Sequence, residues 1–140
     1  MDLKMSENKQ LISVYGTLRK DCSNHRIIEK AKYIGSFESK PIFNMYSIND
    51  AFPALKLGGN NSIVIEVYEV DDATLKRVDG LEGYNPEGKT NLYDRKKIFT
   101  PYGESYIYIY EGGINNSKVI KSGDWKDYEV LNQLNELISH

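Results

Sequence analysis

The sequence predicts an α+β domain built around a strongly curved or barrel-like β-sheet. Stretches with the composition of strands outnumber those with helical periodicity, and they cluster without the strict strand–helix alternation that accompanies parallel sheets. The 140 residues are enough for one domain with a substantial core. The polar residues 1–9 are expected to be disordered, and residues 10–140 to form a single domain.

Strand-like stretches dominate the first half of the chain. Gly16 closes the first of them, Pro41 separates two others, and the turn-forming GGNN sequence at Gly58–Asn61 precedes the last. The expected elements are a strand at Gln10–Tyr15, a brief helix at Asn24–Lys30, and strands at Lys32–Ser39, Ile42–Asn49 and Ser62–Val70.

A helical period replaces the strand pattern at Asp71–Glu82 (DDATLKRVDGLE). This segment opens with acidic residues, which suit the positive end of a helix dipole. It also places Leu75, Val78 and Glu82 at i, i+3 and i+7, on one helical face. A helix with that face towards the core is therefore expected.

The last third of the chain is expected to hold two strands and a helix. The strands, Leu92–Thr100 and Glu104–Tyr110, flank the turn sequence TPYGE. The helix, Asp124–Ile138, is expected to be capped by Asp124 and to bury Trp125. One stripe along it carries four apolar or aromatic residues: Tyr128, Leu131, Leu134 and Ile138.

Composition argues against several functional classes. The chain has 18 basic and 20 acidic residues, so no basic footprint indicates nucleic acid or an anionic membrane as a partner. No apolar run approaches the roughly 20 residues of a membrane span. The single cysteine, Cys22, can form no intrachain disulfide, which fits a reducing cytosol and a cytoplasmic location. With two histidines far apart (His25 and His140), no metal-ligand set is visible.

The segment Gly83–Thr90 (GYNPEGKT) matches the phosphate-loop formula G-x-x-x-x-G-K-[ST]. Such a loop follows a buried strand and opens a helix, whose first amides hold the phosphates. Here the segment follows a helix and leads into a strand, and Pro86 removes one of the required amides. The match is therefore interpreted as chance, and nucleotide binding is not expected.

Glu82 has two interpretations from the residues alone. It shares a face with Leu75 and Val78, and it lies in the last turn before Gly83, where the helix dipole disfavours an anion. Desolvation and the dipole would both raise its pKa towards neutrality, which suits a general acid/base. Alternatively, the helix end is frayed and Glu82 lies in water.

A set of short motifs resembles the γ-glutamylcyclotransferase superfamily over nearly the whole chain. They are VYGTLR (Val14–Arg19), FPAL (Phe52–Leu55), VYEV (Val67–Val70), LEGY (Leu81–Tyr84), Y-D-R (Tyr93–Arg95) and SGDW (Ser122–Trp125). The resemblance implies a small mixed β-barrel flanked by helices. One departure is Ile65, where relatives commonly carry glycine before the strand glutamate (here Glu66), and this change is expected to affect local packing or the pocket floor.

The resemblance also implies a reaction and a site. The substrate would be a small γ-glutamyl amide, cyclised to 5-oxoproline with release of an amine and without metal or cofactor. Glu82 would be the catalytic acid/base, and Tyr15, Gly16, Thr17 and Leu18 would hold the γ-glutamyl part, with their backbone amides facing the substrate.

Two residue roles and one functional question stay open. Tyr93 and Arg95 alternate on a strand, and they either line the pocket as substrate-binding residues or bracket a surface ion pair. Glu66 either lines the barrel or faces water. The alternative to a cyclotransferase is a small-ligand binding protein, or an enzyme acting on a different amide, on the same fold.

Overall fold

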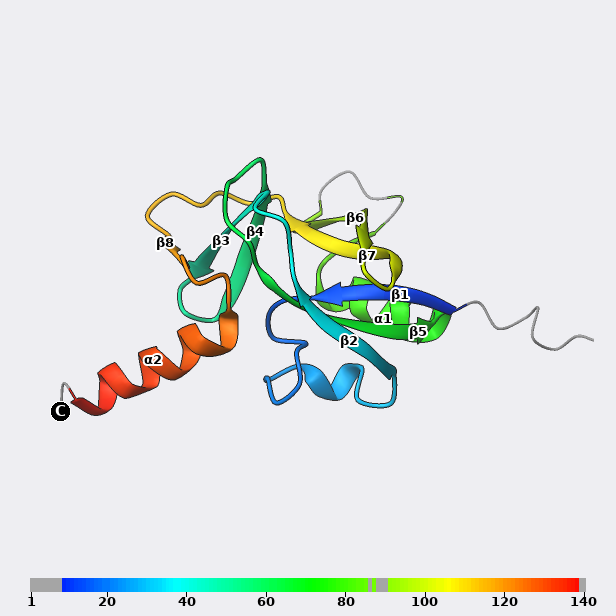
Figure 1. Ribbon diagram of the computed structural model, residues 1–140, viewed down its shortest axis with the longest axis horizontal. Coiled ribbons are helices and arrows are strands. Elements are labelled where there is room, and N and C mark those ends of the chain that lie inside the picture. The colour runs from blue at the N-terminus through cyan, green and yellow to red at the C-terminus, as the bar shows by residue number, and fades with distance from the viewer. Residues whose placement is uncertain (1–8, 86, 88–90, 139–140) are drawn as a thin grey trace, which may run out of the picture.

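The computed structural model describes residues 9–85, 87 and 91–138, and its elements are shown in Figure 1. A short 3₁₀ helix at His25–Ile27 stands where a brief helix was expected over Asn24–Lys30. The other elements are β1 (Lys9–Val14), β2 (Lys32–Glu38), β3 (Phe43–Ile48), β4 (Phe52–Leu57), β5 (Val64–Asp71), α1 (Asp72–Leu81), β6 (Tyr93–Thr100), β7 (Gly103–Tyr110), β8 (Lys118–Val119) and α2 (Trp125–Ile138).

A five-stranded mixed sheet, in the order β2-β5-β1-β7-β6, forms the centre of the molecule. The middle strand β1 runs antiparallel to β5 and parallel to β7, so the sheet is mixed as expected. The carboxyl end of β1 leads directly into the segment at Tyr15–Leu18. The central position of β1 therefore places that segment at the middle of the sheet edge.

A second, three-stranded sheet has the order β4-β3-β8. Side chains from β3 and β4, such as Met45 and Leu55, form one buried cluster with Val67 of β5 and Ile107 of β7. The expected barrel does not close among the described residues, because β2 and β6 end the large sheet as edges and no strand pairing joins it to the small one. The α+β class is confirmed, as two packed sheets with two helices.

Helix α1 has the capped ends that its sequence indicates. Its N-cap, Asp71, accepts a hydrogen bond from the amide of Thr74 at 2.8 Å. At the other end Gly83 adopts a left-handed φ of 65°, and the Tyr84 amide donates to the Asp79 carbonyl at 2.9 Å. The Gly83 amide also donates to the Gly80 carbonyl at 3.2 Å, and the two bonds together form a Schellman motif. The helix therefore ends in a fixed turn at Glu82, its C-cap residue, rather than in a frayed segment.

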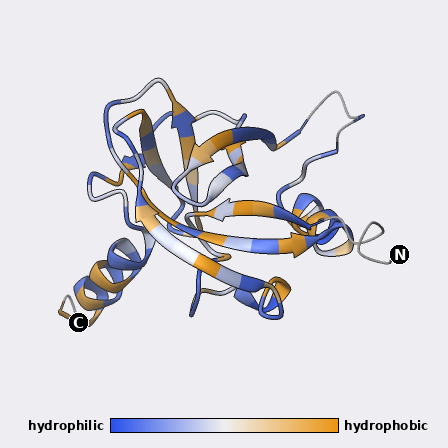
Figure 2. Ribbon diagram, turned by 45° about the vertical axis from the view of Figure 1, so that its right-hand side comes forward, coloured by the Kyte–Doolittle hydropathy of each residue, from blue (hydrophilic) through white to orange (hydrophobic). Residues whose placement is uncertain are grey.

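Helix α2 projects away from the two sheets (Figures 1 and 2). As expected, Trp125 is fully buried and the Asp124 carboxylate accepts bonds from the amides at the start of the helix. The stripe further along the helix is covered only at its start: Tyr128 packs against the core, whereas Leu131, Leu134 and Ile138 are 58%, 47% and 80% exposed.

Strand β4 was not expected from the sequence. It pairs with β3 in antiparallel register, with Pro53 opposite Ser47, and it lies at the edge of its sheet. Proline is tolerated at such an edge because the missing N–H costs no ladder bond. The expectation of disorder for residues 1–9 concerns mainly residues 1–8, which lie outside the described part; Lys9 already belongs to β1. Neither described helix has the length and apolar character to cross a membrane.

Candidate active site

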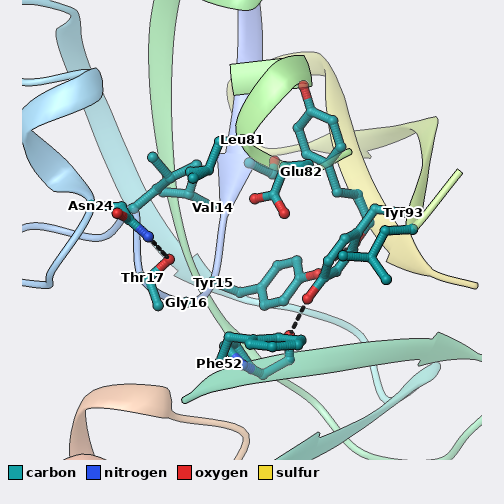
Figure 3. Close-up of a pocket in the computed structure, with 14 residues that line it drawn as sticks. Val14, Tyr15, Gly16, Thr17, Asn24, Phe52, Leu81, Glu82 and Tyr93 are labelled. Carbon is teal, nitrogen blue, oxygen red and sulfur yellow. Dashed lines mark hydrogen bonds between the residues drawn. The ribbon is translucent and has the colours of Figure 1, made fainter. Parts of the chain in front are cut away.

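An open cavity of about 190 Å³ lies between the end of β1, the start of β4, the end of α1, the start of β6 and the end of β7. It is lined by fourteen residues, which come from segments far apart in the sequence: Ser13–Leu18, Asn24, Phe52, Pro53, Leu81, Glu82, Leu92, Tyr93 and Tyr108. Six residues expected in the site lie on it together, namely Tyr15, Gly16, Thr17, Leu18, Glu82 and Tyr93. Figure 3 shows this arrangement.

The loop at one side of the cavity presents backbone donors. Within the described residues, the N–H groups of Gly16, Thr17 and Leu18 have no hydrogen-bond acceptor in the protein. The loop is closed instead by other bonds, in which Arg19 donates its amide to the Gly16 carbonyl at 3.0 Å and Asn24 donates to the Thr17 carbonyl at 2.8 Å. The Asn24 side chain also donates to the Thr17 hydroxyl at 2.9 Å.

Glycine is required at position 16 by close packing. A Cβ atom there would lie 2.4 Å from Cγ of Pro53, far inside van der Waals contact. The absence of a side chain allows the loop to lie directly against β4. This contact connects two sequence motifs, the one that begins at Val14 and the one that begins at Phe52.

A buried charged cluster anchors the same loop from behind. The Arg19 guanidinium, 6% exposed, donates to Glu66 at 2.9 Å and to Asp124 at 2.8 Å. Glu66 also accepts from the Lys20 amide at 2.9 Å and from the Tyr68 hydroxyl at 2.9 Å. Glu66 therefore neither lines the cavity nor faces water, and its bonds fix the backbone just after the Tyr15–Leu18 segment.

Glu82 faces the cavity from the end of α1. Figure 3 shows its half-buried carboxylate directed towards Tyr15 and Tyr93. Burial, with a smaller contribution from the Asp79 carboxylate, raises the pKa of Glu82 from 4.5 to about 7. At neutral pH this group therefore exchanges a proton readily, as a general acid/base must.

Tyrosine hydroxyls fix the aromatic wall of the cavity. Tyr15 donates to the Tyr108 carbonyl at 2.5 Å, and Tyr93 donates to the Pro53 carbonyl at 2.8 Å. Burial raises the pKa of both Tyr15 and Tyr93 well above the usual tyrosine value, so both are neutral hydrogen-bond donors. These bonds hold the rings in place and connect β1, β4, β6 and β7 around the site.

Arg95 lies outside this cavity, although the sequence placed it on the same strand face as Tyr93. Its guanidinium donates to the Asp79 carboxylate of α1 at 2.7 Å. The Arg95 side chain therefore forms an ion pair with α1 rather than lining the cavity with Tyr93.

Several residues on the cavity or beside it were missed in the sequence, among them Asn24, Phe52, Pro53 and Tyr108. Phe52 and Pro53 belong to the FPAL motif, and that motif could have indicated their place in the site. No sequence pattern indicated Asn24 or Tyr108. Ile65 is fully buried between the sheets and does not line the cavity, so it affects packing rather than the pocket floor. Burial raises the pKa of Cys22 to about 11, which disfavours a thiolate nucleophile.

Comparison with known proteins gives matches over most of the chain. The family model described as "Gamma-glutamyl cyclotransferase, AIG2-like" matches residues 12–127. A Vibrio cholerae protein named "Putative gamma-glutamylcyclotransferase" is 40% identical over 117 residues, covering 84% of this chain and 96% of that protein. The Escherichia coli K12 family protein YtfP is 36% identical over 116 residues, covering 83% and 96% respectively.

The fold is also similar to solved structures. The crystal structure of an uncharacterised protein from Pyrococcus horikoshii matches with a TM-score of 0.74 at 27% identity, covering 89% of this chain and 96% of that one. The residues that the family model matches, 12–127, include all fourteen that line the cavity. Residues 128–138 of α2 lie beyond the range of the family model.

Proposed function

The chain belongs to the gamma-glutamyl cyclotransferase, AIG2-like family, and from this membership we propose that it converts a γ-glutamyl amide to 5-oxoproline and a free amine. The observation that carries the proposal is the position of Glu82. A carboxylate whose pKa is about 7 borders the same cavity as three backbone amides without a described protein acceptor.

The reaction needs little more than a folded substrate and proton transfer. The α-amine of the γ-glutamyl group attacks its own side-chain carbonyl carbon, and the new N–C bond closes a five-membered ring. The bond from that carbon to the leaving nitrogen then breaks. Because the attack is intramolecular, a cavity that selects the folded conformer supplies much of the rate advantage.

Glu82 is proposed to carry the proton that this rearrangement moves. The α-ammonium group loses two protons as it becomes the lactam nitrogen, and the leaving nitrogen gains one to depart as an amine. Glu82 in its ionised form accepts a proton from the attacking nitrogen and then gives it to the leaving nitrogen. The other proton passes to solvent. A pKa near neutrality suits both steps.

The amides of Gly16, Thr17 and Leu18 are proposed to stabilise the oxyanion that forms when the carbonyl is attacked. Backbone donors are effective in this role because they are oriented before the reaction begins. Their orientation here is maintained by the Arg19–Glu66 ion pair behind the loop and by the packing of Gly16 on Pro53.

Incubation with a panel of γ-glutamyl amino acids, peptides and amines, followed by measurement of 5-oxoproline, tests the proposal. Release of 5-oxoproline by the wild-type protein but not by Glu82→Gln is the expected result. Saturable binding of a panel member without any 5-oxoproline would favour the alternative of a small-ligand binding protein. Release of the amine together with free glutamate would indicate hydrolysis of the amide instead.

A further inference from the structure

Two carboxylates lie one helical turn apart at the end of α1, and their surroundings differ. Asp79 is 8% exposed; it accepts from the Tyr108 hydroxyl at 2.6 Å and from Arg95 Nη1 at 2.7 Å. The Glu82 carboxylate has no hydrogen-bond or ion-pair partner among the described residues. One carboxylate is thus fixed by charge-assisted bonds, whereas the other is directed into the cavity and has no partner in the described part of the chain.

Arg95 is itself held firmly in place. Its guanidinium carbon lies 5.0 Å from the ring centroid of Tyr84 and 4.4 Å from that of Tyr106. Tyr84 directly follows the Gly83 turn, and its amide donates to the Asp79 carbonyl. Arg95 therefore contacts the terminus of α1 twice, at the Asp79 carboxylate and at the Tyr84 ring, on either side of Glu82 in the sequence.

Tyr108 connects this cluster to the cavity. Tyr108 lines the cavity, its hydroxyl donates to Asp79, and its carbonyl accepts from Tyr15. A shift of the Asp79 carboxylate would therefore displace both the helix end that carries Glu82 and the wall that faces it.

We propose that Asp79 and Arg95 are a positioning pair, which fixes the Glu82 carboxylate towards the cavity and sets its charge environment through two opposite charges held one turn away. The inference rests on the proposed function, in which Glu82 moves protons. The groups that face Glu82 from the surrounding elements are Tyr15, Tyr93 and Tyr108, which are neutral phenols, and Asp79. Among the described residues that face Glu82, Asp79 is thus the only charged one, and Arg95 acts on Glu82 through its ion pair with Asp79.

Variants of the pair should shift the titration of Glu82 in opposite directions. Asp79→Asn removes a negative charge, so the acidic limb of kcat/KM should move down by roughly 0.5–1 pH unit. Arg95→Gln leaves the Asp79 charge without its counter-charge, so the limb should move up. Arg95→Lys keeps the positive charge, so the acidic limb of its pH profile should stay where it is in the wild type. Its kcat should fall with little change in KM, because lysine lacks the planar guanidinium that stacks on Tyr84 and Tyr106.

A titration of Glu82 followed by ¹³C NMR of its labelled carboxyl group measures the same shifts without any substrate. Asp94→Asn is the matched control, because Asp94 lies on the same strand but pairs with Lys96 at the surface. It should leave the titration of Glu82 unchanged. If Asp79→Asn does not fold, the upward shift in Arg95→Gln decides the question.

The outcomes separate this inference from the proposed function. A titration midpoint of Glu82 that is the same in wild type, Asp79→Asn and Arg95→Gln would overturn the inference even in an active enzyme. Shifts in the same direction would also overturn it, since they would indicate a general loss of structure. If the titration midpoint of Glu82 shifts in opposite directions in the two variants but the protein releases no 5-oxoproline, the positioning role is supported and the proposed reaction is wrong.

Discussion

The ring of Pro53 lies so close to Gly16 that a methyl group on Gly16 would overlap two of its atoms, Cγ at 2.4 Å and Cδ at 2.8 Å. Proline cannot rotate its ring away, because the ring is closed on the backbone. One of the two backbones must therefore move if Gly16 gains a side chain, and both border the cavity.

Gly16→Ala should consequently reduce both stability and activity. Overpacking of this kind costs about 1–3 kcal/mol, and a shift of the loop by about 1 Å can lower the rate by about 10²-fold. Denaturant unfolding and 5-oxoproline release measure the two effects. Gly80→Ala is the matched control: beyond its own helix backbone and chain neighbours, no described atom lies within 4 Å of the added methyl. This variant should gain up to about 1 kcal/mol from helix propensity and keep full activity.

Glu82→Gln keeps the shape of the side chain but removes its ability to accept a proton. We expect kcat to fall by about 10²–10⁴ while substrate affinity is largely retained. Rates of 5-oxoproline release and calorimetric binding, measured on the same preparation, check this. A variant with wild-type kcat would exclude Glu82 as the acid/base.

The raised pKa of Glu82 also predicts how stability depends on pH. Between pH 4.5 and 7 the unfolded chain has released this proton and the folded protein retains it, so the group lowers stability as the pH rises. Glu82→Gln lacks this dependence and should become the more stable protein above pH 7, by on the order of 2 kcal/mol. Thermal midpoints of both proteins from pH 5 to 8 measure the difference; a constant gap would contradict the raised pKa.

Arg19→Met should be among the most destabilising substitutions in the chain. It leaves the buried Glu66 carboxylate without its guanidinium partner, and loss of one partner of a buried pair costs about 3–5 kcal/mol. Lys97→Met is the comparison, because the Lys97–Glu104 pair is half exposed and should contribute less than about 1 kcal/mol. Equal losses in urea unfolding would show that the cluster behind the loop adds little.

The exposed stripe of α2 gives a prediction opposite to the one that its periodicity suggests. Leu131→Ser and Leu134→Ser should each change the free energy of unfolding by only about 0.5 kcal/mol, since about half of each residue is exposed to water. Leu75→Ala in α1, where the side chain is buried, should cost about 2–5 kcal/mol. Urea titrations of the three variants distinguish buried from exposed stripes.

Sequence periodicity correctly predicted those helices and strands whose apolar face packs against the core. Helix α1 was predictable because its caps and its buried face are local features. The same face allowed an inward Glu82 but did not exclude a frayed helix end, which only the turn at Gly83 rules out. Strand β4 was missed because Pro53 interrupts its pattern, and only an edge position makes that proline acceptable. The stripe on α2 shows the limit of periodicity, since an apolar face does not specify whether anything covers it.

Resemblance to a family indicated much of the cavity, because four of the six motifs that carry it contribute residues to the cavity lining. The placement of Arg95 could not be derived in the same way. Alternation puts Tyr93 and Arg95 on one side of a strand, but the Asp79 carboxylate lies beside only one of them. This ion pair depends on where α1 packs against β6, and the sequence of β6 alone does not indicate that position.

The assembly of the cavity from remote segments has a consequence for how the protein acquires activity. Ser13 and Ser105, neighbours in the sheet, are 92 positions apart in the chain, and the Tyr15–Tyr108 bond spans 93. Contacts between such distant residues form slowly during folding, because a long loop must close first. No chain that ends before Tyr108 can contain the whole cavity, so a ribosome must have made three quarters of the protein before catalysis is possible. Enzymatic turnover should therefore report global folding, and its loss in denaturant should coincide with the loss of circular dichroism.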